Sequence, residues 1–159
     1  MAARRNATED RWSELSRSEL IALGRALVTE RLESIGCTVQ APTGRGAGML
    51  GVRTPTGRMV EVFVSTQRVG GYAVWTKRRF APAEDRYAAV VLLGEAEEPV
   101  LYVVPSTTPE WHDAAGPFTN RDNVGKKSEA EWGISLAHSS LPALERFAWD
   151  ARRGREYFR

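Results

Sequence analysis

Few residues of this chain have the types and spacing that catalysis or metal binding requires. The two histidines, His112 and His138, and the single cysteine, Cys37, lie far apart in the sequence, so none has a partner at the spacing of a zinc site. The Gly-x-Ser-x-Gly elbow of many serine hydrolases is absent as well. We interpret the histidines as surface residues and Cys37 as a small apolar filler, and no metal site is predicted.

Chemistry is best sought in the stretch VEVFVSTQR, residues 60–68, which has the composition of a β-strand. Successive side chains of a strand point to opposite faces. The face opposite the valines therefore carries Glu61, Phe63, Ser65 and Gln67. Glu61 is a carboxylate of the kind that Mg²⁺ or Mn²⁺ prefers, and Glu30 of the preceding helix is a second candidate acid. The alternative interpretation makes Glu61 a solvated carboxylate near the end of the strand.

Basic residues form local clusters that predict either a solvated face or a phosphate-binding surface. The clusters are Lys77, Arg78 and Arg79, then Lys126 and Lys127, and finally the tail residues Arg152, Arg153, Arg155 and Arg159. Trp75 stands two residues before the first cluster, and an aromatic ring beside cations can stack on a base. The other four tryptophans are expected in the core.

Composition limits the class of protein. The chain has 159 residues, a net charge of +2 and 42% hydrophobic residues, which is typical of one globular domain. This charge is too small to hold nucleic acid by bulk attraction. No apolar run approaches the ~20 residues of a membrane span, and the two arginines near the N-terminus precede no apolar segment of a signal peptide. We expect a soluble, cytoplasmic protein without a membrane partner.

The first elements follow from periodicity and from turn residues. Residues 1–15 are expected to form a flexible arm, and residues 16–159 a single domain. SRSELIALGRALVTERLESIG has apolar residues at helical spacing, candidate N-caps Ser16 and Ser18, and Gly36 at its end. CTVQAP indicates a short strand and TGRGAG a loop. MLGVRTPTGRMVEVFVSTQR indicates a hairpin whose turn contains Pro55 and Gly57.

The second half contains further strands and a closing helix. YAVWTKRRF is expected to be a strand or an irregular edge, and the apolar runs YAAVVLLG and PVLYVVP are expected at the centre of the sheet, buried on both faces. The long polar segment that follows is predicted as a loop with one β-like run, WGISL. SSLPALERFAWD is predicted as the last helix. The order of elements predicts an α/β sandwich with a mixed sheet of about five strands flanked by helices.

Three segments resemble the PD-(D/E)XK nuclease superfamily, which has the restriction-endonuclease-like fold. They are LGRALVTERLESIGCTVQAP, GMLGVRTPTGRMVEVFVSTQR and YAAVVLLGEAEEPVLYVVPS. Within the superfamily, the chain is similar to small bacterial branches with P-S after the last strand and a later GKKS…EW segment, here Gly125 to Trp132. The resemblance covers roughly residues 19–149.

The resemblance also implies that the nuclease site is degenerate. In the superfamily, an Asp on the second strand and an (Asp/Glu)-x-Lys motif on the third hold divalent metals and activate water. These three positions fall on Met49, Phe63 and Ser65. None of the three side chains can replace the family's acids and lysine, so no catalytic residue is predicted.

Three functions remain open from the sequence. The first is a catalytically silent nuclease-fold protein that binds DNA or RNA through the basic residues Arg68, Lys77, Arg78, Arg79, Lys126 and Lys127, together with Trp75. The second is a protein-interaction or scaffold domain, with a protein partner or a second copy of itself. The third is a nuclease with relocated acids, which alone would need Mg²⁺ or Mn²⁺.

Overall fold

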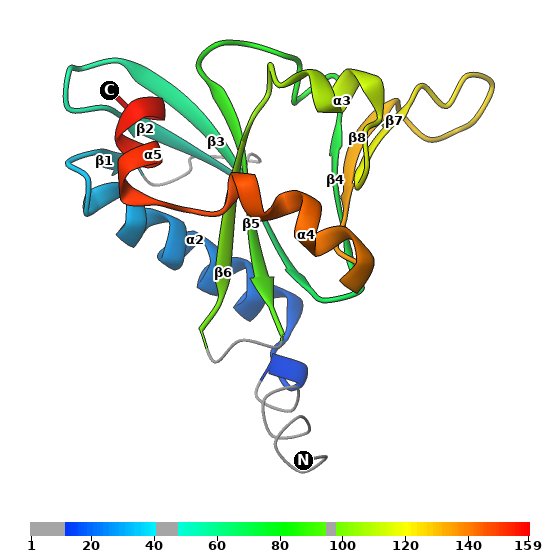
Figure 1. The fold of residues 1–159 in the computed structure, drawn as a ribbon, viewed down its shortest axis with the longest axis horizontal. Helices are drawn as coiled ribbons and strands as arrows, with labels where there is room; N and C mark the ends of the chain where they lie inside the picture. Colours follow the sequence, from blue (N-terminus) through cyan, green and yellow to red (C-terminus); the bar gives the residue numbers. More distant parts are fainter. Residues whose placement is uncertain (1–11, 41–47, 95–97) are drawn as a thin grey trace.

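The computed structural model describes residues 12–40, 48–94 and 98–159, and it has a mixed α/β architecture with two sheets (Figure 1). Sheet A contains, in spatial order, β1 (Thr38–Gln40), β2 (Met49–Arg53), β3 (Met59–Arg68), β5 (Arg86–Leu93) and β6 (Val100–Pro105). Sheet B contains β4 (Tyr72–Thr76), β8 (Glu131–Ser135) and β7 (Phe118–Arg121). The predicted five-stranded mixed sheet is confirmed, whereas the second sheet was not expected.

Strand β3 lies at the centre of sheet A. It pairs antiparallel with β2, as the predicted hairpin requires, and parallel with β5. The apolar runs of β5 and β6 are buried on both faces as predicted, but β6 is an edge strand. The backbone of the C-terminal segment covers that edge, because the Trp149 N–H donates to the Leu101 carbonyl over 2.7 Å. A strongly apolar strand such as β6 can therefore lie at the edge of a sheet when another segment covers that edge.

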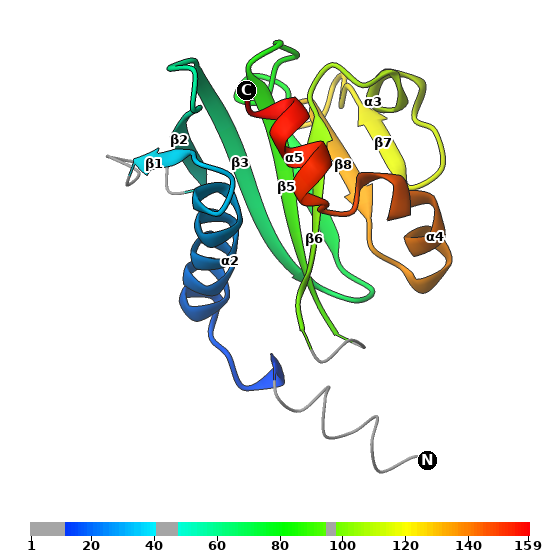
Figure 2. The same ribbon diagram turned by 60° about the vertical axis from the view of Figure 1, so that its left-hand side comes forward.

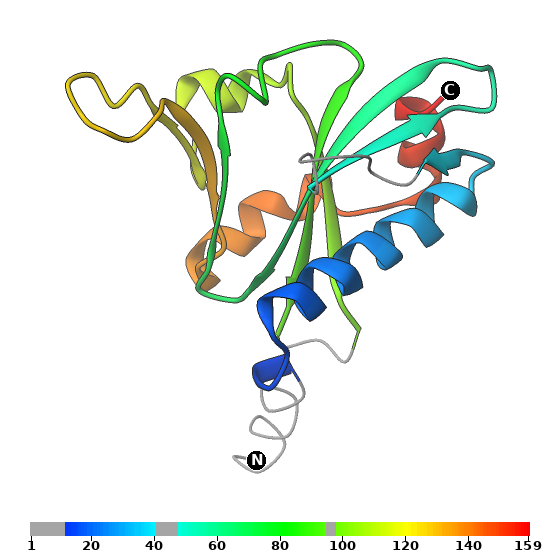
Figure 3. The same cartoon turned by 180° about the vertical axis from the view of Figure 1, so that it is seen from behind.

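Helices cover one face of sheet A, and sheet B covers most of the other (Figures 2 and 3). Helices α2 (Arg17–Glu33) and α5 (Ala151–Tyr157) contribute to the first core, the apolar cluster that includes Val28, Leu32, Val60, Val62 and Phe158. The second core lies on the opposite face and includes Phe63, Trp75, Phe80, Trp111 and Trp132. The segments α3 (Pro109–Asp113), η1 (His138–Ser140), α4 (Leu141–Leu144) and η2 (Glu145–Phe147) lie on this second side.

Helix α2 begins and ends where the sequence predicts. Ser16 and Glu19 form a capping box, in which the Glu19 N–H donates to Ser16 Oγ over 3.2 Å and the Ser16 N–H donates to Glu19 Oε2 over 2.7 Å. Gly36 follows the helix with φ of +91°, a backbone conformation that favours glycine. Inside the helix, a Cβ atom at Gly24 would overlap the Thr66 hydroxyl. Glycine at this position therefore allows α2 to approach β3 closely.

Several expectations about the chain ends and the long loop need correction. The expected arm, residues 1–15, falls mostly outside the described residues, but Trp12 is 6% exposed and belongs to the first core. The segment predicted as the last helix forms only the short pieces η1, α4 and η2, while α5 follows in the basic tail. The tail is packed, because Phe158 is 1% exposed and its ring lies 5.0 Å from that of Tyr87. The polar segment after β6 contains β7 as well as β8.

The glycine-rich loop predicted for TGRGAG lies outside the described residues except for Gly48. Within the described part of the chain, no helix has the length and apolar character that a membrane span requires.

We predict that Gly24→Ala destabilises the fold. Alanine has a higher helix propensity by about 1 kcal/mol, but the overlap with Thr66 should cost more, so that the free energy of unfolding falls by about 1 to 3 kcal/mol. Urea unfolding followed by tryptophan fluorescence measures the change. The double variant Gly24→Ala/Thr66→Ala should recover part of the loss, and a stability of Gly24→Ala equal to that of wild type would contradict the close contact.

Candidate functional site

The positions at which the superfamily would hold metal ligands belong to the packed interior. Phe63 is 6% exposed and makes an edge-to-face contact with Phe80, with 5.3 Å between the ring centroids. Met49 lies opposite Phe63 in the β2–β3 pair and packs against the same core. Phe63 therefore completes the second core, and it leaves no room there for a hydrated metal ion.

The other residues of the predicted nuclease site are not brought together. Ser65 accepts a hydrogen bond of 3.0 Å from Gln67 Nε2. Glu61 is not merely solvated, because its carboxylate accepts a hydrogen bond of 3.1 Å from the Arg86 guanidinium. Glu30 is exposed on α2, which packs on the opposite face of sheet A from Phe63. The proposed pair of relocated acids, Glu30 and Glu61, thus lies on two sides of the sheet. Among the described residues, no group of three or more histidine, cysteine, aspartate or glutamate side chains could hold a metal ion.

Two predicted basic clusters, about fifty residues apart in sequence, lie on a turn and a loop that adjoin at one end of sheet B. Strand β4 pairs with β8 so that Thr76 lies opposite Glu131, and the Lys77 N–H donates to the Ala130 carbonyl over 2.8 Å. The turn after β4 and the β7–β8 loop, residues 122–130, therefore lie side by side. Figures 1 and 3 show this loop projecting from the body of the protein. We call the turn 77–79 together with this loop the basic end of sheet B.

The cations of the basic end differ in their surroundings. Lys77 donates to Asn120 and to Asp122, the latter over 2.6 Å, and its Nζ lies 4.2 Å from the centroid of the Trp132 ring. Arg78 forms an ion pair of 3.1 Å with Glu129. Among the residues that the structure describes, no carboxylate pairs with the exposed side chains of Arg79, Lys126 and Lys127. Lys77 is therefore a structural cation, and the latter three are available for a ligand.

Two further predicted binding residues lie away from the surface of the basic end. Trp75 is 9% exposed, and its ring lies 5.5 Å from Phe80 and 5.9 Å from Trp111. Stacking on a base would require this aromatic cluster to open, so the expected role of Trp75 at the surface is not supported by its position. Arg68 is at the far end of β3, where its guanidinium donates to the Trp12 and Leu15 carbonyls. It anchors the start of the described chain.

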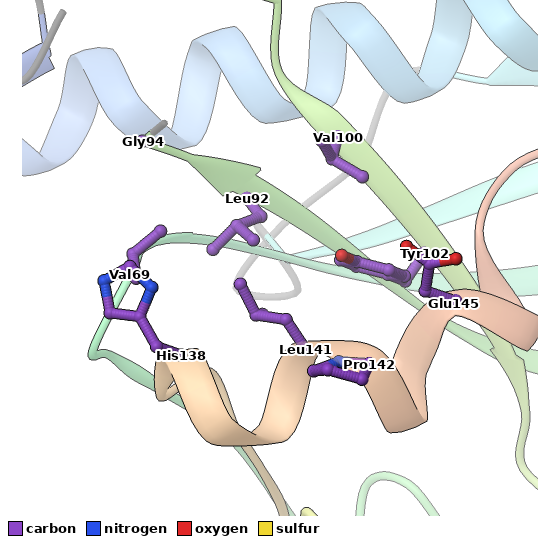
Figure 4. Close-up of a pocket in the computed structure, with 9 residues that line it drawn as sticks. All are labelled: Val69, Leu92, Gly94, Val100, Tyr102, His138, Leu141, Pro142 and Glu145. Atoms are coloured by element: carbon purple, nitrogen blue, oxygen red, sulfur yellow. The ribbon is translucent and has the colours of Figure 1, made fainter. Parts of the chain in front are cut away.

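Sequence reasoning missed an apolar cavity of about 460 Å³ between sheet A and the η1–α4–η2 segment. Figure 4 shows His138 beside Val69 at one end, Tyr102 and Glu145 at the other, and Leu141 between them. The pKa of Tyr102 is raised by burial and by the negative charge of Glu145, so its phenol stays protonated at neutral pH. The cavity can hold an apolar group, and His138 lies at the opposite end from Tyr102 and Glu145. Nothing local in the sequence indicates it, because its lining comes from four separate segments.

Comparisons with known proteins leave the family open. No family model matches the chain, and neither a curated protein nor a solved structure does so.

We predict that Phe63 is required for stability. Phe63→Ala should lower the free energy of unfolding by about 3 to 5 kcal/mol, because the truncation leaves a cavity between Phe80 and the sheet. Ser65→Ala on the same strand face is the control and should cost about 1 kcal/mol or less. Chemical denaturation of both variants provides the measurement. Equal stabilities of the two variants would show that Phe63 is not a core residue.

Proposed function

We propose that the protein binds nucleic acid through its phosphate backbone at the basic end of sheet B and does not cleave it. The observation that supports this proposal is the contact of the 77–79 turn with the base of the β7–β8 loop, which puts exposed cations from two distant segments at the same end of sheet B. Lys and Arg side chains at such a surface contact phosphates without reading the base sequence. The apolar side chain of Phe63 at a position where the superfamily carries an acid supports binding without cleavage.

The arrangement also predicts the strength of this binding. Asp122, Glu129 and Glu131 pair with Lys77, Arg78 and Arg121, so the surface presents only a few uncompensated charges. Each phosphate neutralised by a cation contributes about −0.9 to the slope of log K against log salt concentration. Three available cations therefore predict a slope of about −3, which is typical of weak binding without sequence preference.

A second candidate is the protein-interaction or scaffold role, favoured by a single exposed residue. Val124 is 90% exposed at the β7–β8 loop, and contact with a protein partner would remove this apolar side chain from water. Such a protein would show no affinity for a duplex even at low salt. Light scattering of the purified chain would then test whether the partner is a second copy of itself.

We predict that the triple variant Arg79→Ala/Lys126→Ala/Lys127→Ala weakens duplex binding at low salt and flattens the salt slope by about 3. Fluorescence anisotropy of a labelled duplex, titrated at several salt concentrations with Mn²⁺ present, measures both quantities. The control variant Arg53→Ala/Arg152→Ala/Arg155→Ala changes the net charge equally at other exposed sites, and it should leave the slope near that of wild type.

Denaturing gels of the same samples test the absence of cleavage. Intact DNA is expected. Cut DNA would overturn the silent assignment, and equal slopes for the two triple variants would remove the basic end from the binding surface.

A further inference from the structure

A second cavity, of about 540 Å³, lies between the first half of α2 and the second half of β3. Its polar lining comes from both elements: Arg17 and Arg25 from α2, and Ser65, Thr66, Gln67 and Arg68 from β3. None of the described residues that line it is acidic. The cavity therefore combines three guanidinium groups and two hydroxyls without a compensating carboxylate in its lining.

Arg25 is the unusual member of this lining. Its Nε and Nη2 atoms are buried and make no hydrogen bond to any described residue. Burying such donors without a partner is unfavourable, and most buried polar groups in proteins are paired. Nε–H and one Nη2–H also lie along one edge of the guanidinium plane, the edge that binds two oxygens of a carboxylate or phosphate at once. The protein thus carries an unpaired oxyanion-binding edge on a side chain that lines the cavity. This edge is closed to solvent in the free protein, so the Arg25 side chain must turn toward the cavity for an anion to reach it.

The backbone of β3 supplies a further donor at the same place. The Val64 N–H donates to the Gly48 carbonyl over 2.7 Å, whereas the Glu61 N–H donates to Asp85 on the opposite edge of the strand. Hydrogen-bonding direction alternates along a strand, so the Thr66 N–H points to the same edge as that of Val64. Strand β2 begins at Met49, opposite Phe63, and no described strand pairs with this edge beyond Val64. The free edge of β3 therefore borders the cavity that α2 also lines.

We propose that this cavity binds a phosphate group, which the Arg25 side chain turns to hold in two-point contact and which Arg17 and Arg68 neutralise. Three positive charges without an acid suit a dianion better than a single carboxylate, and the Thr66 hydroxyl, which is on the α2 side of β3, can donate to a remaining oxygen. The Arg68 guanidinium is already positioned by the Trp12 and Leu15 carbonyls. The ligand is either a free phosphate compound or the terminal phosphate of a nucleic acid strand. The site shares no residue with the basic end of sheet B, so it does not depend on the proposed function.

The test is thermal unfolding of the full chain in inorganic phosphate and in chloride of equal ionic strength, with sulfate as a further control. Phosphate should raise the Tm of wild type by roughly 5 °C or more at a concentration a hundredfold above its Kd. Calorimetric titration with inorganic phosphate gives that Kd directly. An equal Tm in phosphate and chloride, with no heat of binding, would overturn the proposal.

Arg25→Met tests the role assigned to the guanidinium. The variant keeps the apolar stem but removes the unpaired donors, so its Tm in chloride should equal or exceed that of wild type while the phosphate-dependent rise disappears. Arg31→Met on the same helix is the matched control, because Arg31 does not line the cavity, and it should keep the rise. The same phosphate-dependent rise in Arg25→Met as in wild type would refute the site.

Two further variants keep the test decisive if Arg25→Met does not fold. Arg25→Lys retains the charge but loses the two-point edge, and it should bind phosphate at least tenfold more weakly. Arg17→Met removes an exposed cation of the lining and should weaken binding by about tenfold as well. Unchanged affinity in both variants would refute the proposal.

Competition distinguishes the two sources of phosphate. A 5′-phosphorylated oligonucleotide that displaces inorganic phosphate, while its 5′-hydroxyl counterpart does not, assigns the cavity to a strand end. Displacement by neither oligonucleotide assigns it to a small phosphate compound. The triple variant at the basic end should leave phosphate binding unchanged, so failure of one proposal can be told from failure of the other.

Discussion

The arrangement of this protein depends on the burial of β3 on both faces. Val60 and Val62 pack into the first core beneath α2, and Phe63 packs into the second core beneath sheet B. An ionised side chain at the position of Phe63 would lose its hydration between these layers, at a cost that only a metal or an ion pair could offset. The aromatic ring of Phe63 and the second sheet above it together bury this position of β3 without an ionised group. The same packing explains why the only carboxylate on that strand face, Glu61, lies near the start of the strand, where Arg86 reaches it.

The polar half of β3 begins where its pairing with β2 ends. From Ser65 onward the strand keeps β5 on one edge, while no described strand pairs with the other edge, which borders the cavity beside α2. The first half of β3 is packed on both faces and requires apolar side chains. The second half tolerates polar side chains, because the cavity beside α2 gives them space and solvent. The approach of α2 depends in turn on Gly24 against Thr66. The change from VEVFV to STQR within one strand therefore coincides with a change in the neighbours of the strand.

The features predicted correctly are those that local sequence determines. Helix α2 has its capping box and terminal glycine within its own segment, and the β2–β3 hairpin has its turn at residues 54–57. Sheet B could not be predicted in this way, because β4, β7 and β8 are short and are joined by pairing between distant segments. The segment before α5 has apolar helical spacing, yet η1, α4 and η2 follow one another without a continuous helix. The burial of Trp75 depends on its contact with Trp111, which lies 36 positions later in the chain. The basic residues Lys77 to Arg79, which follow Trp75 in the sequence, therefore gave the misleading expectation that Trp75 is exposed.

Charge counted along the sequence likewise says little about which cations are free to bind. Lys77, Arg58 and Arg86 are held by carboxylates, and only the fold reveals it. An exposed cation such as Lys126 costs the free protein almost nothing, so its presence is weak support for a ligand. A buried guanidinium without a partner is costly in every molecule that lacks the ligand. Selection for stability alone would replace Arg25 with an apolar residue of similar length. The same selection would neither favour nor remove Lys126, because Lys126 hardly affects stability. For this reason the two buried, unpaired donors of Arg25 are a stronger indication of binding than the larger number of exposed cations at the basic end of sheet B.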